Sequence, residues 1–150
     1  MTTAAIIASR ATGSEPAAAR LVLPFDLRQR SRLLARLESG EEIGLVMPRG
    51  SILRGGDRLQ SSDGRVVEVV AAREELSVVR SQDARLLARA AYHLGNRHVA
   101  VEVTRDAICY VRDHVLDEML RGLGLVVDSE QLPFEPEAGA YSQSHGHSHG

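Results

Sequence analysis

The sequence lacks several residue types, and each absence narrows the classes of protein to which it can belong. It has 150 residues but only one cysteine, no tryptophan and 3% aromatic residues. One cysteine cannot close a disulfide within the chain or build a cysteine-based zinc site, which fits a reducing compartment. No segment reaches the ~18 apolar residues of a membrane span, and the N-terminus lacks the basic start and apolar run of a secretory signal. We therefore expect a cytoplasmic protein without a membrane partner.

The sequence also lacks lysine and an excess of either charge. All 18 basic residues are arginine, and they nearly balance 20 acidic residues to a net charge of −2. A general nucleic-acid binder needs a basic surface, so this balance argues against a nucleic-acid partner. Hydrophobic residues make up 43% of the chain, which is enough for a packed and mostly aliphatic core.

The common enzymatic motifs are missing as well. There is no H-E-x-x-H helix, no P-loop, no G-x-G-x-x-G and no G-x-S-x-G. Asp113 and His114 could form part of an acid/base pair, but no nucleophile accompanies them. We expect that the protein is not an enzyme, and a hydrolase that uses a metal at a dimer interface stays as a remote alternative.

The first half of the chain has the pattern of a small all-β domain over residues 1–73. Glycine- and aspartate-rich turns separate short apolar runs such as 43–47 and 66–71. The segment 27–37 is ambiguous, because its leucines suit a helix face while the following Ser-Gly suits a hairpin. We predict a strand there, since its neighbours are strands.

Residues 74–137 have a β-α-β-β-α-β pattern, which predicts a ferredoxin-like domain and an α+β protein overall. The first helix is capped by Ser81 or Asp83 and ends at Gly95, the residue suited to a left-handed conformation. The second helix starts at Asp113. The predicted strands cover 76–80, 98–103, 107–111 and a last one from residue 125. Two helices should cover one face of the sheet and leave the other face open for a partner.

A tail of residues 138–150 is rich in glycine, serine and histidine, and we expect it to be flexible. It carries His145, His147 and His149. Alternating imidazoles on a flexible chain can fold around one cation, and imidazole is a borderline donor suited to nickel, copper and zinc. A solvated tail or an expression tag is the alternative, although tags usually have consecutive histidines.

Three further histidines lie within the ferredoxin-like segment. Alternation along 98–103 places His98 with Glu102 on the open face, and two copies across a twofold axis would form a pair of imidazoles. Taken alone, His98 fits an ordinary residue at the start of a strand better than it fits a ligand. His93 fits a cation at a helix C-terminus, and His114 fits an accessory surface ligand. Cys109 suits a small buried hydrophobe.

Several segments together resemble the UreE family of urease accessory nickel chaperones. The resemblance rests on YHLGNRHV at residues 92–99, DHVLDEMLR at 113–121, QLPFEPEAGAY at 131–141, LPFDLRQ at 23–29, PRG at 48–50 and LRGGD at 53–57. It covers nearly the whole chain, and the combination is far more specific than any single motif.

The resemblance implies an N-terminal β domain that docks protein partners, a C-terminal ferredoxin-like metal-binding domain and a homodimer. It implies a nickel site with one His98 from each protomer, joined by the tail histidines. A UreG-type GTPase and the urease apoprotein with its accessory complex are the implied partners. Some members carry a second histidine where this chain has Arg112, which weakens an accessory site at His114. The short tail favours delivery of Ni²⁺ over storage.

Two other functions compete with nickel delivery. One is a general buffer for divalent metals, since Zn²⁺ or Cu²⁺ can bind the same imidazoles in vitro and the affinity order favours copper over nickel. The other is a docking module whose tail has no metal-binding role.

Overall fold

The computed structural model describes residues 4–139. The chain forms two compact units, one that holds the chain up to Ala72 and one that spans Arg73–Ala138. Within the described part of the chain, no helix is long and apolar enough to cross a membrane.

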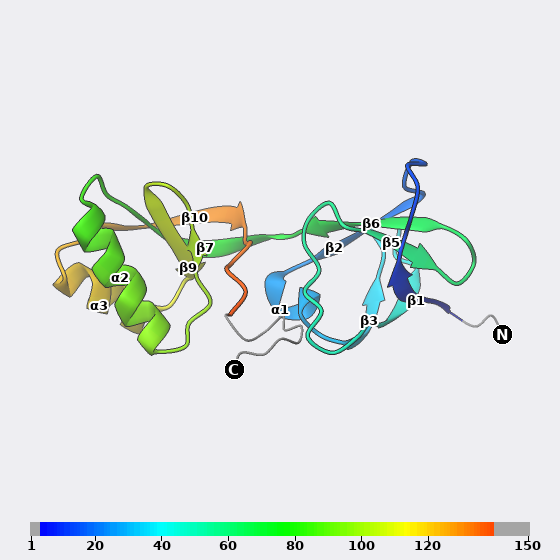
Figure 1. Cartoon of the computed structure of the whole chain (residues 1–150), viewed down its shortest axis with the longest axis horizontal. Coiled ribbons are helices and arrows are strands. Elements are labelled where there is room, and N and C mark those ends of the chain that lie inside the picture. Colours follow the sequence, from blue (N-terminus) through cyan, green and yellow to red (C-terminus); the bar gives the residue numbers. More distant parts are fainter. Residues whose placement is uncertain (1–3, 140–150) are drawn as a thin grey trace, which may run out of the picture. The chain divides into compact units, whose positions relative to one another are not determined.

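The first unit is a barrel-like sheet of six strands with one short helix (Figure 1). The strands follow the order β2-β6-β5-β1-β4-β3, in which β1 pairs with β4, and β2 with β6, in parallel. The elements are β1 (Ala5–Arg10), β2 (Ala19–Leu23), α1 (Phe25–Arg28), β3 (Arg32–Arg36), β4 (Glu42–Val46), β5 (Arg58–Ser61) and β6 (Val66–Ala71).

This unit forms because its short strands alternate between core and solvent. In β4, Ile43 and Leu45 are buried while Gly44 between them faces outward, the period-2 pattern of a half-buried strand. The predicted strand over 27–37 is confirmed for its second half as β3, whereas its start lies in α1. The core is aliphatic, as its composition predicted, and consists of Ile7, Leu21, Leu23, Leu37, Ile43, Leu45, Met47, Leu53, Leu59, Val67 and Val69.

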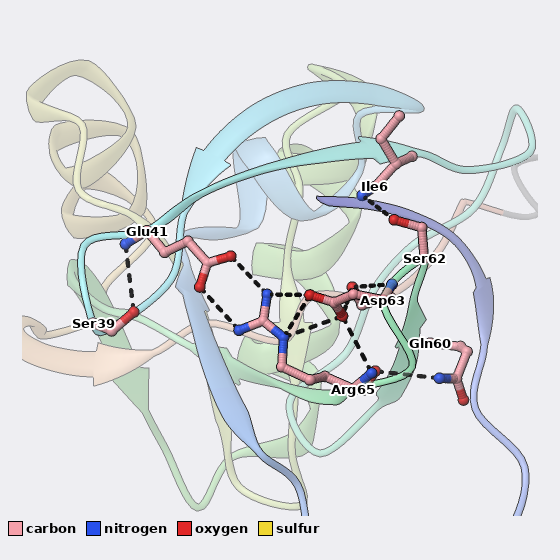
Figure 2. A network of polar contacts seen from close by, with 8 residues as sticks. Ile6, Ser39, Glu41, Gln60, Ser62, Asp63 and Arg65 are labelled. Carbon is pink, nitrogen blue, oxygen red and sulfur yellow. Dashed lines mark hydrogen bonds and ion pairs between the residues drawn. The ribbon is translucent and has the colours of Figure 1, made fainter. Parts of the chain in front are cut away.

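A charged network ties the β5–β6 turn to the β3–β4 turn (Figure 2). The Arg65 guanidinium donates to Glu41 at 2.6 and 2.9 Å, and its Nε donates to Asp63 at 2.9 Å. The Ser61 hydroxyl donates to Asp63 at 2.6 Å. Hydrogen bonds from Arg65 lower the pKa values of both carboxyl groups below their ordinary range. The network is a structural clamp between two turns.

The second unit is a four-stranded antiparallel sheet with two helices on one face (Figure 1). Its elements are β7 (Arg73–Arg80), α2 (Ala84–Asn96), β8 (Glu102–Val103), β9 (Ala107–Val111), α3 (His114–Gly122) and β10 (Val127–Pro133). The sheet order β10-β7-β9-β8 with helices after β7 and β9 is the ferredoxin-like arrangement. The predicted α+β fold class is confirmed.

Helix α3 is fixed to this sheet by a buried carboxylate. Asp117 is 4% exposed, and its Oδ1 accepts hydrogen bonds from the hydroxyls of Ser77 and Tyr110, each at 2.6 Å. Burial and the bond to Asp117 raise the pKa of Tyr110 above its ordinary range, so the phenol stays a donor. The surrounding core consists of Val79, Ala90, Leu94, Ile108, Tyr110, Leu116, Leu120, Leu125 and Val127.

The face of this sheet opposite the helices is not open, contrary to our expectation. Register places Val78, Cys109 and Glu102 next to one another on that face, and both Val78 and Cys109 are buried. The chain after β10 returns along it: the N–H of Glu135 donates to Glu102 Oε1 at 2.9 Å, and that of Glu137 donates to the Val101 carbonyl at 2.8 Å. The returning segment takes the place that we had assigned to a partner.

Candidate metal centre

Helix α2 precedes His98, the first predicted metal ligand. The start of this helix is defined by a capping residue. Asp83 is the N-cap, with a side chain that accepts hydrogen bonds from the N–H groups of Arg85 at 3.0 Å and Leu86 at 3.2 Å. These bonds satisfy two of the free amides at the helix start. Ser81, the other predicted cap, accepts from the Asp83 N–H instead.

The end of α2 places His98 in a special backbone position. The N–H of His98 donates to the Gly95 carbonyl at 2.9 Å, and that of Val99 donates to the Leu94 carbonyl at 3.1 Å. This pair of bonds is the Schellman ending, which requires a left-handed residue directly after the C-cap, Arg97. His98 is that residue, with φ of 59°, and it is the single non-glycine residue with positive φ between residues 4 and 139.

Two local expectations are therefore wrong. Gly95 does not end the helix in a left-handed conformation but lies inside α2, and His98 does not begin a strand, because β8 covers only Glu102–Val103. The physical reason is packing: Val99 and Val101 lie against the core that contains Leu94, so the chain turns only after Arg97. A turn at Gly95 would have placed the polar Asn96 where the motif prefers a hydrophobic contact.

The His98 side chain is exposed to solvent on a backbone that is held from both sides. On its N-terminal side the backbone of His98 is held by the hydrogen bonds that end α2. On its C-terminal side it is held by Val99, which is partly buried against the core. An exposed imidazole on a restrained backbone can bind a cation without reorganising the fold. Left-handed strain at a non-glycine residue is a feature that clusters at functional positions.

His93 lies five residues before His98 in the last turn of α2 and is half-buried. Its ring contacts the ring of Tyr92 edge-on, with 5.2 Å between the centroids. A partly buried ring with an aromatic neighbour, near the negative end of the helix dipole, has a structural role already. The arrangement supports His93 less than His98 as a ligand.

His114 is the first residue of α3 and is exposed. The preceding Asp113 is the N-cap, as predicted, and its carboxylate accepts from the Leu116 N–H at 3.0 Å. Asp113 therefore has a structural role in capping the helix, and among residues 4–139 His114 belongs to no group of three or more possible ligands.

The tail histidines His145, His147 and His149 lie outside the described residues. The point at which the chain leads to them is defined, because Glu137 is hydrogen-bonded to Val101, three residues from His98. The eight residues from Glu137 to His145 span at most ~29 Å when extended. A tail imidazole can therefore reach His98 of its own chain within the covalent limits of the backbone.

The described residues do not supply a complete metal site by themselves. Between residues 4 and 139 no group of three or more histidine, cysteine, aspartate or glutamate side chains is close enough to hold a metal ion. Cys109 is buried, as predicted, and burial raises the pKa of its thiol, which disfavours a thiolate ligand. Any ion at His98 needs additional donors from another segment or another copy of the chain.

Two features of this unit were not predicted from the sequence. The buried Asp117 was missed because an acid in the first turn of a helix is ordinarily exposed and interacts with the helix dipole. Its position four residues after Asp113, on the buried face of the helix, could have indicated that it is buried. The returning segment near Glu135 has no periodicity that reveals it. Asp117 holds α3 on the sheet, and the returning segment holds the start of the tail beside Glu102 and Val101.

The chain matches two protein-family models that together cover nearly all of it. Residues 4–72 match the N-terminal domain of the UreE urease accessory protein, and residues 74–150 match its C-terminal domain. The boundary between the two models falls at the same point of the sequence as the division between the two compact units, after Ala72.

Curated relatives match over most of their own lengths. The Citrobacter koseri urease accessory protein UreE is 58% identical over 134 residues, 88% of this chain and 88% of the relative. The UreE proteins of Alkalilimnicola ehrlichii and Pseudomonas putida are 55% and 54% identical over 90% and 85% of this chain, and over 83% and 78% of their own. With both domains matched in order and at this identity, the chain belongs to the UreE family of urease accessory proteins.

Proposed function

We propose that this protein binds Ni²⁺ as its cargo and delivers it, in the cytoplasm, for assembly of the urease metallocentre. Membership of a urease accessory family supports a role in urease assembly and not an enzymatic one. The observation that carries the metal part is the exposed His98, held in a left-handed position beside the start of a histidine-bearing tail.

In the proposed site, one Ni²⁺ is bound by His98 of each protomer of a homodimer and by tail histidines His145, His147 or His149. Two lines of reasoning support a metal site that is shared between two protomers. The described residues of one chain hold no group of three ligands, and a twofold axis brings a residue near its own mate. Borderline imidazole donors suit nickel, although zinc and copper bind them too.

A site of this kind suits delivery more than storage. Few ligands, some of them on a tail, give a labile complex that a better-coordinated acceptor can outcompete. The proposed recipients are a UreG-type GTPase and the urease apoprotein complex. The N-terminal unit is proposed to dock them. His114 and His93 are at most accessory ligands in this scheme.

A reconstituted urease activation assay, with free nickel held at a fixed and limiting concentration, tests the proposal. We expect His98→Asn, combined with alanine at the three tail histidines, to abolish activation, while the single His93→Gln variant activates normally. Asparagine is chosen because it tolerates the left-handed conformation without an imidazole.

The alternatives give different results in that assay. A general metal buffer would bind zinc and nickel alike, yet its loss would not change activation at a fixed free nickel concentration. A docking module would activate urease normally without His98 and the tail histidines. Either result would contradict the proposed delivery.

A further inference from the structure

Helix α2 carries a solvent-facing row of side chains that the nickel site does not use. Arg85, Arg89, Tyr92 and Asn96 are all exposed, and their spacing of four, three and four residues places them on one side of a helix. The opposite side, with Ala90 and Leu94, is buried in the core. We call these four exposed residues the α2 stripe.

The charge of the α2 stripe is of one sign and is not neutralised. Helix α2 contains no aspartate or glutamate. Among residues 4–139, neither Arg85 nor Arg89 forms an ion pair or a side-chain hydrogen bond, and the same holds for Arg97 at the end of the helix. By contrast, the arginines paired with carboxylates include Arg10, Arg36, Arg65, Arg80, Arg112 and Arg121.

This arrangement opposes the stability of the helix itself. Arg85 and Arg89 are like charges four residues apart, which repel each other. Arg85 also lies in the first helical turn, where the positive end of the helix dipole disfavours a cation. Neither charge has a favourable electrostatic interaction within the helix, which leaves both available to a partner outside the fold.

Tyr92 adds an aromatic anchor to the stripe. It is 68% exposed, whereas Phe25, Tyr110 and Phe134 are buried, so it is the exposed aromatic of the described chain. Its ring lies edge-on against His93, which restricts its motion. Exposed tyrosine with arginine is the composition of protein-interface hot spots.

We propose that the α2 stripe docks an acidic surface of the urease apoprotein complex, one of the two proposed recipients of the metal ion. This inference rests on the proposed function. The stripe runs along the helix whose C-terminal end presents His98, and its two arginines lie toward the other end of that helix, away from the proposed pair of His98 side chains. A protein that accepts a divalent cation gathers anionic ligands at the receiving site. Complementary charge would orient that site toward His98 as the two proteins meet.

The test measures association of the full-length, nickel-loaded chain with the immobilised urease apoprotein complex. For Arg85→Glu/Arg89→Glu, we expect an association rate constant about tenfold lower at low salt, with a weaker dependence on salt. Arg85→Gln/Arg89→Gln should give a smaller drop in the same direction. Tyr92→Ser should mainly raise the dissociation rate.

The matched control is Arg73→Glu/Arg105→Glu, which changes the same charge at exposed arginines of the same unit that lie outside α2. We expect less than a threefold change in its association rate. Equal effects of the two double variants would show that net charge alone matters, and an unchanged rate in Arg85→Glu/Arg89→Glu would remove the stripe from the interface. Tighter binding of the wild-type chain to single-stranded RNA than to the apoprotein would also overturn the proposal.

Two further readouts separate this inference from folding and from nickel binding. Arg85→Glu should raise the melting temperature, because a glutamate in the first turn favours the helix, so slower association cannot come from unfolding. Nickel affinity in calorimetry should be the same in both double variants. A wild-type chain that binds no nickel contradicts the proposed function, whereas normal nickel affinity with stripe-independent docking contradicts only this inference.

Discussion

Helices α2 and α3 lie on the same sheet and end in the same way, yet they differ in the residues that they use. In α3 the left-handed residue of the Schellman ending is Gly124, with φ of 99°, and the bonds from Gly124 and Leu125 to Arg121 and Leu120 match those at the end of α2. In α2 the same place is taken by His98. Helix α3 also has an internal Glu118–Arg121 ion pair, whereas α2 has no acid at all.

The difference teaches where stability and function separate in this unit. Helix α3 follows the rules that favour a helix, with a glycine at its end, paired charges on its surface and a buried carboxylate that fixes it to the sheet. Helix α2 departs from those rules at its first turn and at its end. Departures of this kind are expected at functional positions, and both the proposed nickel ligand and the α2 stripe are found there.

The largest expected effect falls on α3. Asp117→Ala leaves the buried hydroxyls of Ser77 and Tyr110 without their acceptor, which should lower the free energy of unfolding by about 3 kcal/mol. Urea denaturation measures this change. Glu118→Ala on the exposed face of the same helix is the control and should change it by less than ~0.5 kcal/mol. Equal losses in the two variants would mean that the buried carboxylate does not anchor the helix.

Smaller changes in stability, of opposite sign at the two helix ends, should distinguish α2 from α3. Gly124→Ala should cost about 1 kcal/mol, because alanine resists the left-handed conformation. His98→Gly should gain up to about 1 kcal/mol for the same reason while it removes the imidazole. Thermal denaturation of the two variants gives the comparison. A protein destabilised by His98→Gly would show that the imidazole supports the fold, and the contrast between the helices would fail.

The smallest expected effect is on the stability of the fold in acid, and it should differ between arginines that pair with carboxylates and arginines that do not. The folded state lowers the pKa of Glu41 from its ordinary 4.5, and lowers that of Asp63 as well, through hydrogen bonds from Arg65. Their contribution is present above the unfolded pKa values and is lost as pH falls through the folded ones. In Arg65→Gln this contribution is absent, so we expect the free energy of unfolding of the variant to fall less steeply than that of the wild type below about pH 4.5. Arg85→Gln, from an unpaired arginine, should leave the pH profile of unfolding unchanged.

Most of the fold could be predicted from the sequence, because it follows from short-range patterns. Strands such as β6 and β9 have the predicted ends, since apolar runs are bounded by turn residues there. The capping aspartates Asp83 and Asp113 were also identified, because a cap acts on amides two or three residues away. The order of these elements was sufficient to predict the ferredoxin-like sheet.

The geometry of the site could not be predicted in the same way. Propensity places the left-handed residue at Gly95, but the contact of Val99 with the core decides that it is His98, and that contact is a tertiary one. The returning chain after β10 is likewise held by long-range bonds from Glu135 and Glu137, which no local pattern reveals. Sequence identified the residue of interest, and packing decides how it is presented.

The most direct test of the shared site is a nickel titration of the full-length chain, with its mass followed by light scattering. The account predicts a particle of two chains whose tight binding saturates at one Ni²⁺ per two chains. His98→Gly, which keeps the helix end intact, should lose at least tenfold in that affinity. A lone subunit that binds nickel tightly, or a His98→Gly variant with wild-type affinity, would contradict it.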